Sequence, residues 1–100
     1  MKISSKEEIV TYLKNKKGFL YERFGVTSMG VFGSFVRDEQ TSSSDIDMVI
    51  EMERGRKSIH SFLQLKRFLE NELGRKVDLG FENALKPVIR EKLKRRIIYV

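Results

Sequence analysis

The stretch VFGSFVRDEQTSSSDIDMVIEM, residues 31–52, decides the fold of this chain because it ends in a strand that carries two charged residues. In its final part, DIDMVIEM, apolar and polar positions alternate, and alternate positions of a β-strand face opposite sides. One side therefore holds Ile46, Met48, Ile50 and Met52, and the other holds Asp45, Asp47, Val49 and Glu51. The pattern predicts a strand with one apolar face and a pair of carboxylates on the other.

Upstream of this stretch, the sequence predicts a helix over Lys6–Phe24 and a strand over residues 26–33. Ser4 or Ser5, followed by Glu7 or Glu8, forms a capping-box pattern before apolar residues at helical spacing. Gly25 can adopt the left-handed conformation that ends a helix. The run VTSMGVFG is rich in β-branched and aromatic residues, which favour strands. The polar residues 37–44 predict a loop.

Downstream, the sequence predicts two more helices and two more strands. Ser58 caps a helix that Gly74 ends, and its apolar stripe comprises Ile59, Phe62, Leu65, Leu69 and Leu73. The run KVDLGF, residues 76–81, predicts a strand with Asp78 facing away from Val77, Leu79 and Phe81. Pro87 suits the first turn of a final helix carrying Val88, Ile89 and Leu93, and IIYV, residues 97–100, predicts a closing strand. This order predicts an α/β sandwich whose helices cover one side of the sheet, in a single domain spanning residues 1–100.

Composition narrows the function classes. The chain of 100 residues contains no cysteine, so disulfides and thiolate metal sites are excluded and a reducing, cytoplasmic location is expected. No apolar run approaches a membrane span or a signal peptide, so no membrane association is expected. The net charge of +6 favours an anionic partner, although such a charge also serves solubility alone.

The aspartates are the candidate metal ligands. Asp45 and Asp47 project in parallel with Cα atoms roughly 6.5 Å apart, and their mutual repulsion suggests a compensating cation. Hard carboxylate oxygens suit Mg²⁺ or Mn²⁺ better than zinc. If its strand is a neighbour, Asp78 has the phase to join them, and three carboxylates could hold the two metal ions used for displacement at phosphorus. The alternative reading of an Asp-x-Asp pair is a solvated strand end.

Gly33, Ser34 and Arg37 are the candidate phosphate-binding residues. A glycine directly after a strand lets backbone N–H groups approach a phosphate, and a serine hydroxyl can donate to it. Arg37 could neutralise polyphosphate charge. Each also has an alternative interpretation without function: the Gly-Ser pair could simply form a turn, and the arginine could simply be solvated. His60 is predicted to be a surface residue. The basic run REKLKRR, residues 90–96, is predicted to form the outer face of a helix or to contact nucleotide, nucleic acid or a partner.

Taken together, Gly33-Ser34 and, after ten intervening residues, Asp45-Ile46-Asp47 resemble the signature of the DNA polymerase beta-like nucleotidyltransferase superfamily. The runs FGSFVRDEQTSSSDIDMVIE, KVDLGFENALKPVIREKL and IIYV are similar to its minimal nucleotidyltransferases over nearly the whole chain. The resemblance implies an α+β nucleotidyltransferase fold, with helices on one face of a mixed sheet and the metal site on the other. In this family Asp45, Asp47 and Asp78 would be the catalytic and metal-binding residues.

The resemblance also implies a partner and a reaction. Many minimal nucleotidyltransferases are antitoxins paired with a HEPN-domain ribonuclease, which implies nucleotide transfer from ATP, or another nucleoside triphosphate, to a toxin tyrosine with Mg²⁺. One departure is Asp38, because the family commonly has glycine directly after the arginine, and a carboxylate there could weaken nucleotide binding. Two alternatives stay open: an antitoxin that masks its toxin without chemistry, and, less favoured, a small nucleic-acid-binding module.

Overall fold

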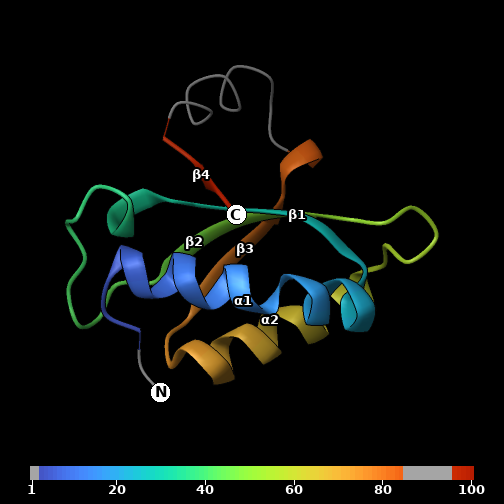
Figure 1. Cartoon of the computed structure of the whole chain (residues 1–100), viewed down its shortest axis with the longest axis horizontal. Helices are drawn as coiled ribbons and strands as arrows, with labels where there is room; N and C mark the ends of the chain where they lie inside the picture. Colours follow the sequence, from blue (N-terminus) through green and yellow to red (C-terminus); the bar gives the residue numbers. More distant parts are fainter. Residues whose placement is uncertain (1–2, 85–95) are drawn as a thin grey trace.

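The computed structural model describes residues 3–84 and 96–100, and in them two helices cover one face of a sheet (Figure 1). The elements are α1 (Lys6–Phe24), β1 (Val26–Phe32), the 3-10 turn η1 (Gly33–Phe35), β2 (Ile46–Met52), α2 (Ile59–Leu73), β3 (Val77–Phe81), the 3-10 turn η2 (Glu82–Ala84) and β4 (Ile98–Tyr99). The predicted order is confirmed for these elements. The final helix predicted from Pro87, and all but the last residue of the basic run 90–96, lie outside the described residues.

The helix ends follow the predicted signals. The Ser5 hydroxyl accepts the N–H of Glu8 at the start of α1, and Ser58 caps α2 in the same way. Gly25 and Gly74 end the two helices in the left-handed conformation, with φ of 76° and 69°. These local signals fix where each helix stops and therefore where β1 and β3 begin.

The sheet is mixed and has the order β3-β2-β1-β4. β1 pairs antiparallel with β2 and with β4, whereas β2 and β3 are parallel. A parallel pair needs a long crossover, and α2 supplies it by returning the chain from the end of β2 to the start of β3. The crossover brings the starts of β2 and β3 together at the same end of the sheet.

The core lies between the helices and one face of the sheet. It joins Ile9, Leu13, Leu20, Leu65, Leu69 and Leu73 of the helices to Met29, Val31, Ile46, Met48, Ile50, Val77 and Leu79 of the strands. The predicted apolar stripe of α2 is wrong at Ile59, the first residue of the helix, which is 71% exposed. Val49 faces away from the helices, as predicted, yet it is buried. A side chain on its neighbour Gly30 would overlap Ile97, so the C-terminal segment packs on that face beside Val49.

Candidate nucleotidyl-transfer site

The pairing of β2 with β3 brings the predicted carboxylates together. Asp47 lies directly opposite Asp78 in the parallel register, which confirms the prediction that their strands are adjacent. Asp45 precedes the first residue of β2. Asp45 and Asp78 are exposed, whereas Asp47 is half-buried. All three therefore stand at one end of the sheet, on the face that α1 and α2 leave free.

The electrostatics of Asp47 show that these groups interact. Its pKa is raised, first by burial and then by the negative charges of Asp78 and Asp45, while the positive charge of Arg37 opposes the rise. Burial and the neighbouring negative charges therefore make the ionised form of Asp47 less favourable. A cation bound between the carboxylates would offset this penalty.

The donor chemistry of the three aspartates fits a hard divalent cation. Carboxylate oxygens are the ligands that Mg²⁺ and Mn²⁺ prefer. Within residues 3–84 and 96–100, however, no three His, Asp or Glu side chains converge closely enough to form a finished ligand cage. Glu51, which shares the Asp47 face, is engaged elsewhere, because its two oxygens bind Lys57 and the N–H of Asn83. The backbone register sets Asp47 beside Asp78, and sharing an ion would require their carboxylates and that of Asp45 to converge further.

Gly33 contacts Asp47, which joins the two halves of the sequence motif. Gly33 has a φ of 78°, and a Cβ built on it would overlap Oδ2 of Asp47 and lie 2.9 Å from its Cγ. A glycine is needed here both for the backbone conformation and for the space that the Asp47 carboxylate occupies. Ser34 follows in η1, so the predicted phosphate-binding pair begins directly beside the predicted metal ligand.

Arg37 and Asp38 lie in the turn that follows η1. Arg37 is exposed and forms an ion pair with Glu39 at 3.2 Å, while its charge still acts on Asp47. Asp38 adopts a positive φ of 57° and pairs with Lys6 at 3.6 Å. This conformation favours glycine and is tolerated by aspartate, which gives a backbone reason for the glycine expected at this position.

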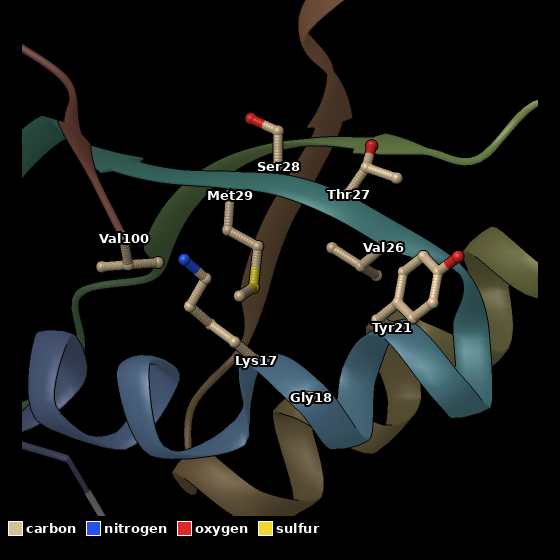
Figure 2. Close-up of a pocket in the computed structure, with 8 residues that line it drawn as sticks. All are labelled: Lys17, Gly18, Tyr21, Val26, Thr27, Ser28, Met29 and Val100. Atoms are coloured by element: carbon tan, nitrogen blue, oxygen red, sulfur yellow. The ribbon is translucent and has the colours of Figure 1, made fainter.

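Of two hollows in the described part of the structure, one is lined by an aspartate of the candidate site and the other is not. One, of about 280 Å³, lies beside Asp45 and is lined by Ser42–Ser44, Gly74, Arg75 and Lys76. The other, of about 410 Å³, lies between α1 and the first half of β1, with Lys17 and Tyr21 at its rim (Figure 2). None of the three aspartates lines this larger hollow, whereas Asp45 lines the smaller one.

Fold and motif together define a class of protein, and the sequence comparison agrees. The chain belongs to the family described as "Nucleotidyltransferase domain", whose profile matches residues 13–100. The predicted fold class and the prediction of a nucleotidyltransferase enzyme are confirmed.

Among individual relatives, the protein adenylyltransferase MntA of Thermococcus cleftensis is 42% identical over 94 residues, which cover 94% of each chain. A candidate protein adenylyltransferase of Methanocaldococcus jannaschii is 38% identical over 94 residues, covering 93% of this chain and 95% of the other. A solved candidate minimal nucleotidyltransferase superposes with a TM-score of 0.79 at 33% identity and 95% coverage of both chains.

More distant solved structures share the fold. A toxin–antitoxin crystallised with AMP-PNP has a TM-score of 0.68 at 20% identity, over 86% of this chain and 70% of that one.

In the part of this chain that the structure describes, no helix has the length and apolar character needed to cross a membrane.

Proposed function

We propose that this protein transfers a nucleoside monophosphate from ATP to a hydroxyl group, and that the acceptor is a tyrosine of a HEPN ribonuclease toxin. The observation that carries the proposal is the register of β2 and β3, which sets Asp47 opposite Asp78 beside the Gly33 turn. Relatives named protein adenylyltransferases support AMP as the transferred group. Solved toxin–antitoxin structures with this fold, one of them with AMP-PNP, suggest the class of partner and the nucleotide.

Asp45, Asp47 and Asp78 would hold two Mg²⁺ ions, with Mn²⁺ as an alternative. When bound, such ions neutralise the triphosphate and stabilise both the attacking and the leaving oxygen. Gly33 would offer a close backbone approach to the terminal phosphates, and the Ser34 hydroxyl would donate to them. Arg37, exposed at the rim, would balance part of the triphosphate charge.

The reaction uses the carboxylates in different ways. The acceptor oxygen attacks the α-phosphorus of ATP, a new P–O bond forms, the bond from the α-phosphorus to the β-bridging oxygen breaks, and pyrophosphate leaves. Asp78 is exposed beside Asp47 and would take the proton from the acceptor hydroxyl. Burial and the charges of Asp78 and Asp45 raise the pKa of Asp47, and a bound cation would compensate those charges and favour its ionised form.

The test uses the protein with the product of its neighbouring gene. We expect labelled AMP from α-labelled ATP to appear on that protein in the presence of Mg²⁺, and peptide mass spectrometry to place it on a tyrosine. Label on another residue would correct the acceptor. Tight binding of the neighbour without any label would favour the alternative function, an antitoxin that masks its toxin without chemistry.

A further inference from the structure

Arg75 occupies a place that the sequence analysis did not single out. It directly follows Gly74, the residue that ends α2, and precedes Lys76, whose carbonyl accepts the N–H of Ile46 at 2.9 Å. The backbone of Arg75 is therefore anchored at the point where β3 first pairs with β2. Its half-buried side chain points back across the segment that leads to Asp45.

The Arg75 guanidinium binds three carbonyl oxygens from two separate parts of the chain. Nη1 donates to Thr41 O at 2.8 Å and to Ser44 O at 3.0 Å, and Nε donates to Ile3 O at 2.5 Å. The N–H of Ile3 in turn donates to Leu73 O at 2.8 Å. The end of the 37–44 loop is thus fastened to the N-terminal segment and to the end of α2 through one side chain.

The same guanidinium also contacts the phosphate-binding turn. It lies 4.9 Å from the ring centroid of Phe35, which belongs to η1 with Gly33 and Ser34 and is fully buried. A planar cation over a ring face is attracted by the ring's quadrupole. One residue therefore touches both arms of the candidate site, the turn that begins at Gly33 and the loop that ends at Asp45.

Asp45 is held from both sides by this arrangement. Its preceding residue, Ser44, is bound through its carbonyl to Arg75, and its following residue, Ile46, is bound through its N–H to Lys76. Asp45 itself is exposed, so the position of its carboxylate depends on these two backbone bonds rather than on packing. We infer that Arg75 is a positioning residue, which holds Asp45 at the distance from Asp47 and from the Gly33 turn that cation binding requires. This inference rests on the proposed function.

Lysine cannot replace Arg75 in this role. A single ammonium lacks the planar fork that reaches three carbonyls at once and does not stack on Phe35 in the same way. Residues that orient a metal ligand typically contribute about 10- to 100-fold to metal affinity or activity. For Arg75→Lys we therefore expect the Mn²⁺ concentration at half-maximal AMP transfer to rise about tenfold or more, with activity largely restored at saturating Mn²⁺. Arg67→Lys, on the exposed side of α2, is the matched control and should leave both unchanged.

Hydrogen exchange supplies a readout that does not depend on activity. In Arg75→Lys, the amides of residues 41–44 should exchange about tenfold faster than in wild type, while those of α1 keep their rates. Should Arg75→Lys fail to fold, Arg75→Gln is measured instead, because its side-chain amide keeps an NH2 donor but carries no charge. Unchanged loop exchange in a folded variant, or an unchanged Mn²⁺ requirement, would overturn the inference. If wild type itself transfers no nucleotide, the proposed function fails, and the exchange rates still decide whether Arg75 holds the loop.

Discussion

Replacing Gly33 with alanine should destabilise the protein by about 2–5 kcal/mol. A side chain at a left-handed backbone position costs about 1–2 kcal/mol. The new Cβ would also overlap Oδ2 of Asp47 and lie 2.9 Å from its Cγ, so the carboxylate has to move away. Forcing extra atoms into a packed position typically costs about 1–3 kcal/mol more.

Gly55 provides the control for the backbone contribution. Its φ is 88°, but a Cβ there would meet nothing within 4 Å. Gly55→Ala should therefore cost only the backbone penalty of about 1–2 kcal/mol. The difference between the two variants isolates the contact of Gly33 with Asp47.

The assay is urea denaturation of metal-free protein, with thermal melts beside it. Gly33→Ala should be less stable than Gly55→Ala by about 1–3 kcal/mol, and each kcal/mol corresponds to about 4–8 °C for a domain of this size. Combining Gly33→Ala with Asp47→Ala should recover most of this difference, because the overlapping carboxylate is gone. Equal stability of the two alanine variants, or strict additivity in the double variant, would refute a direct contact between Gly33 and Asp47.

Two further predictions concern charge at the site. Ionised Asp47 destabilises the metal-free fold because its pKa is raised, so Asp47→Asn should raise the free energy of unfolding at pH 7 by about 0.2–1 kcal/mol, the range for a cross-strand pair. Both folded and unfolded Asp47 are protonated well below its usual pKa, so this gain should vanish in melts near pH 3, and a gain that persists there would contradict the electrostatic cause. Asp38→Asn removes the charge that follows Arg37 in the chain and pairs with Lys6, and it should tighten binding of Mg²⁺-ATP by up to about fivefold at low salt, since the Coulomb interaction at such an exposed site is about 1 kcal/mol or less. Asp38→Gly should bind as tightly and also relieve the positive φ, and equal calorimetric affinities for wild type and both variants would show that the Asp38 charge faces away from the nucleotide.

Local patterns in the sequence predicted most of the fold. The alternation in residues 45–52 predicted β2 and its apolar face, and the serine and glycine caps predicted the ends of both helices. These features depend on residues a few positions apart, so a single sequence carries them. The burial of Val49 depends on a segment far along the chain, around Ile97, and no periodicity within β2 signals it.

The candidate site was predictable in part. The phase of Asp78 within its strand indicated that it could join Asp47, and the parallel register places the two residues opposite one another. Asp38 was read from its charge alone, whereas its positive φ is a property of the folded turn. Arg75 was missed because its three acceptors are backbone carbonyls, which leave no residue-type signal; only its place directly after Gly74 pointed to it.

The rate of AMP transfer by Asp78→Asn shows whether the paired carboxylates of β2 and β3 carry the reaction. Asp78 is exposed opposite Asp47, so the amide should preserve the fold while removing a proton acceptor and a cation ligand. Glu53→Gln is the matched control, because Glu53 follows the opposite end of β2 from Asp47 and accepts a hydrogen bond from Tyr21. With Mg²⁺, α-labelled ATP and the neighbouring gene's product, we expect Glu53→Gln to label at the wild-type rate and Asp78→Asn to label at least about 100-fold more slowly. Labelling by Asp78→Asn at the wild-type rate would contradict a transfer reaction built on the paired carboxylates of β2 and β3.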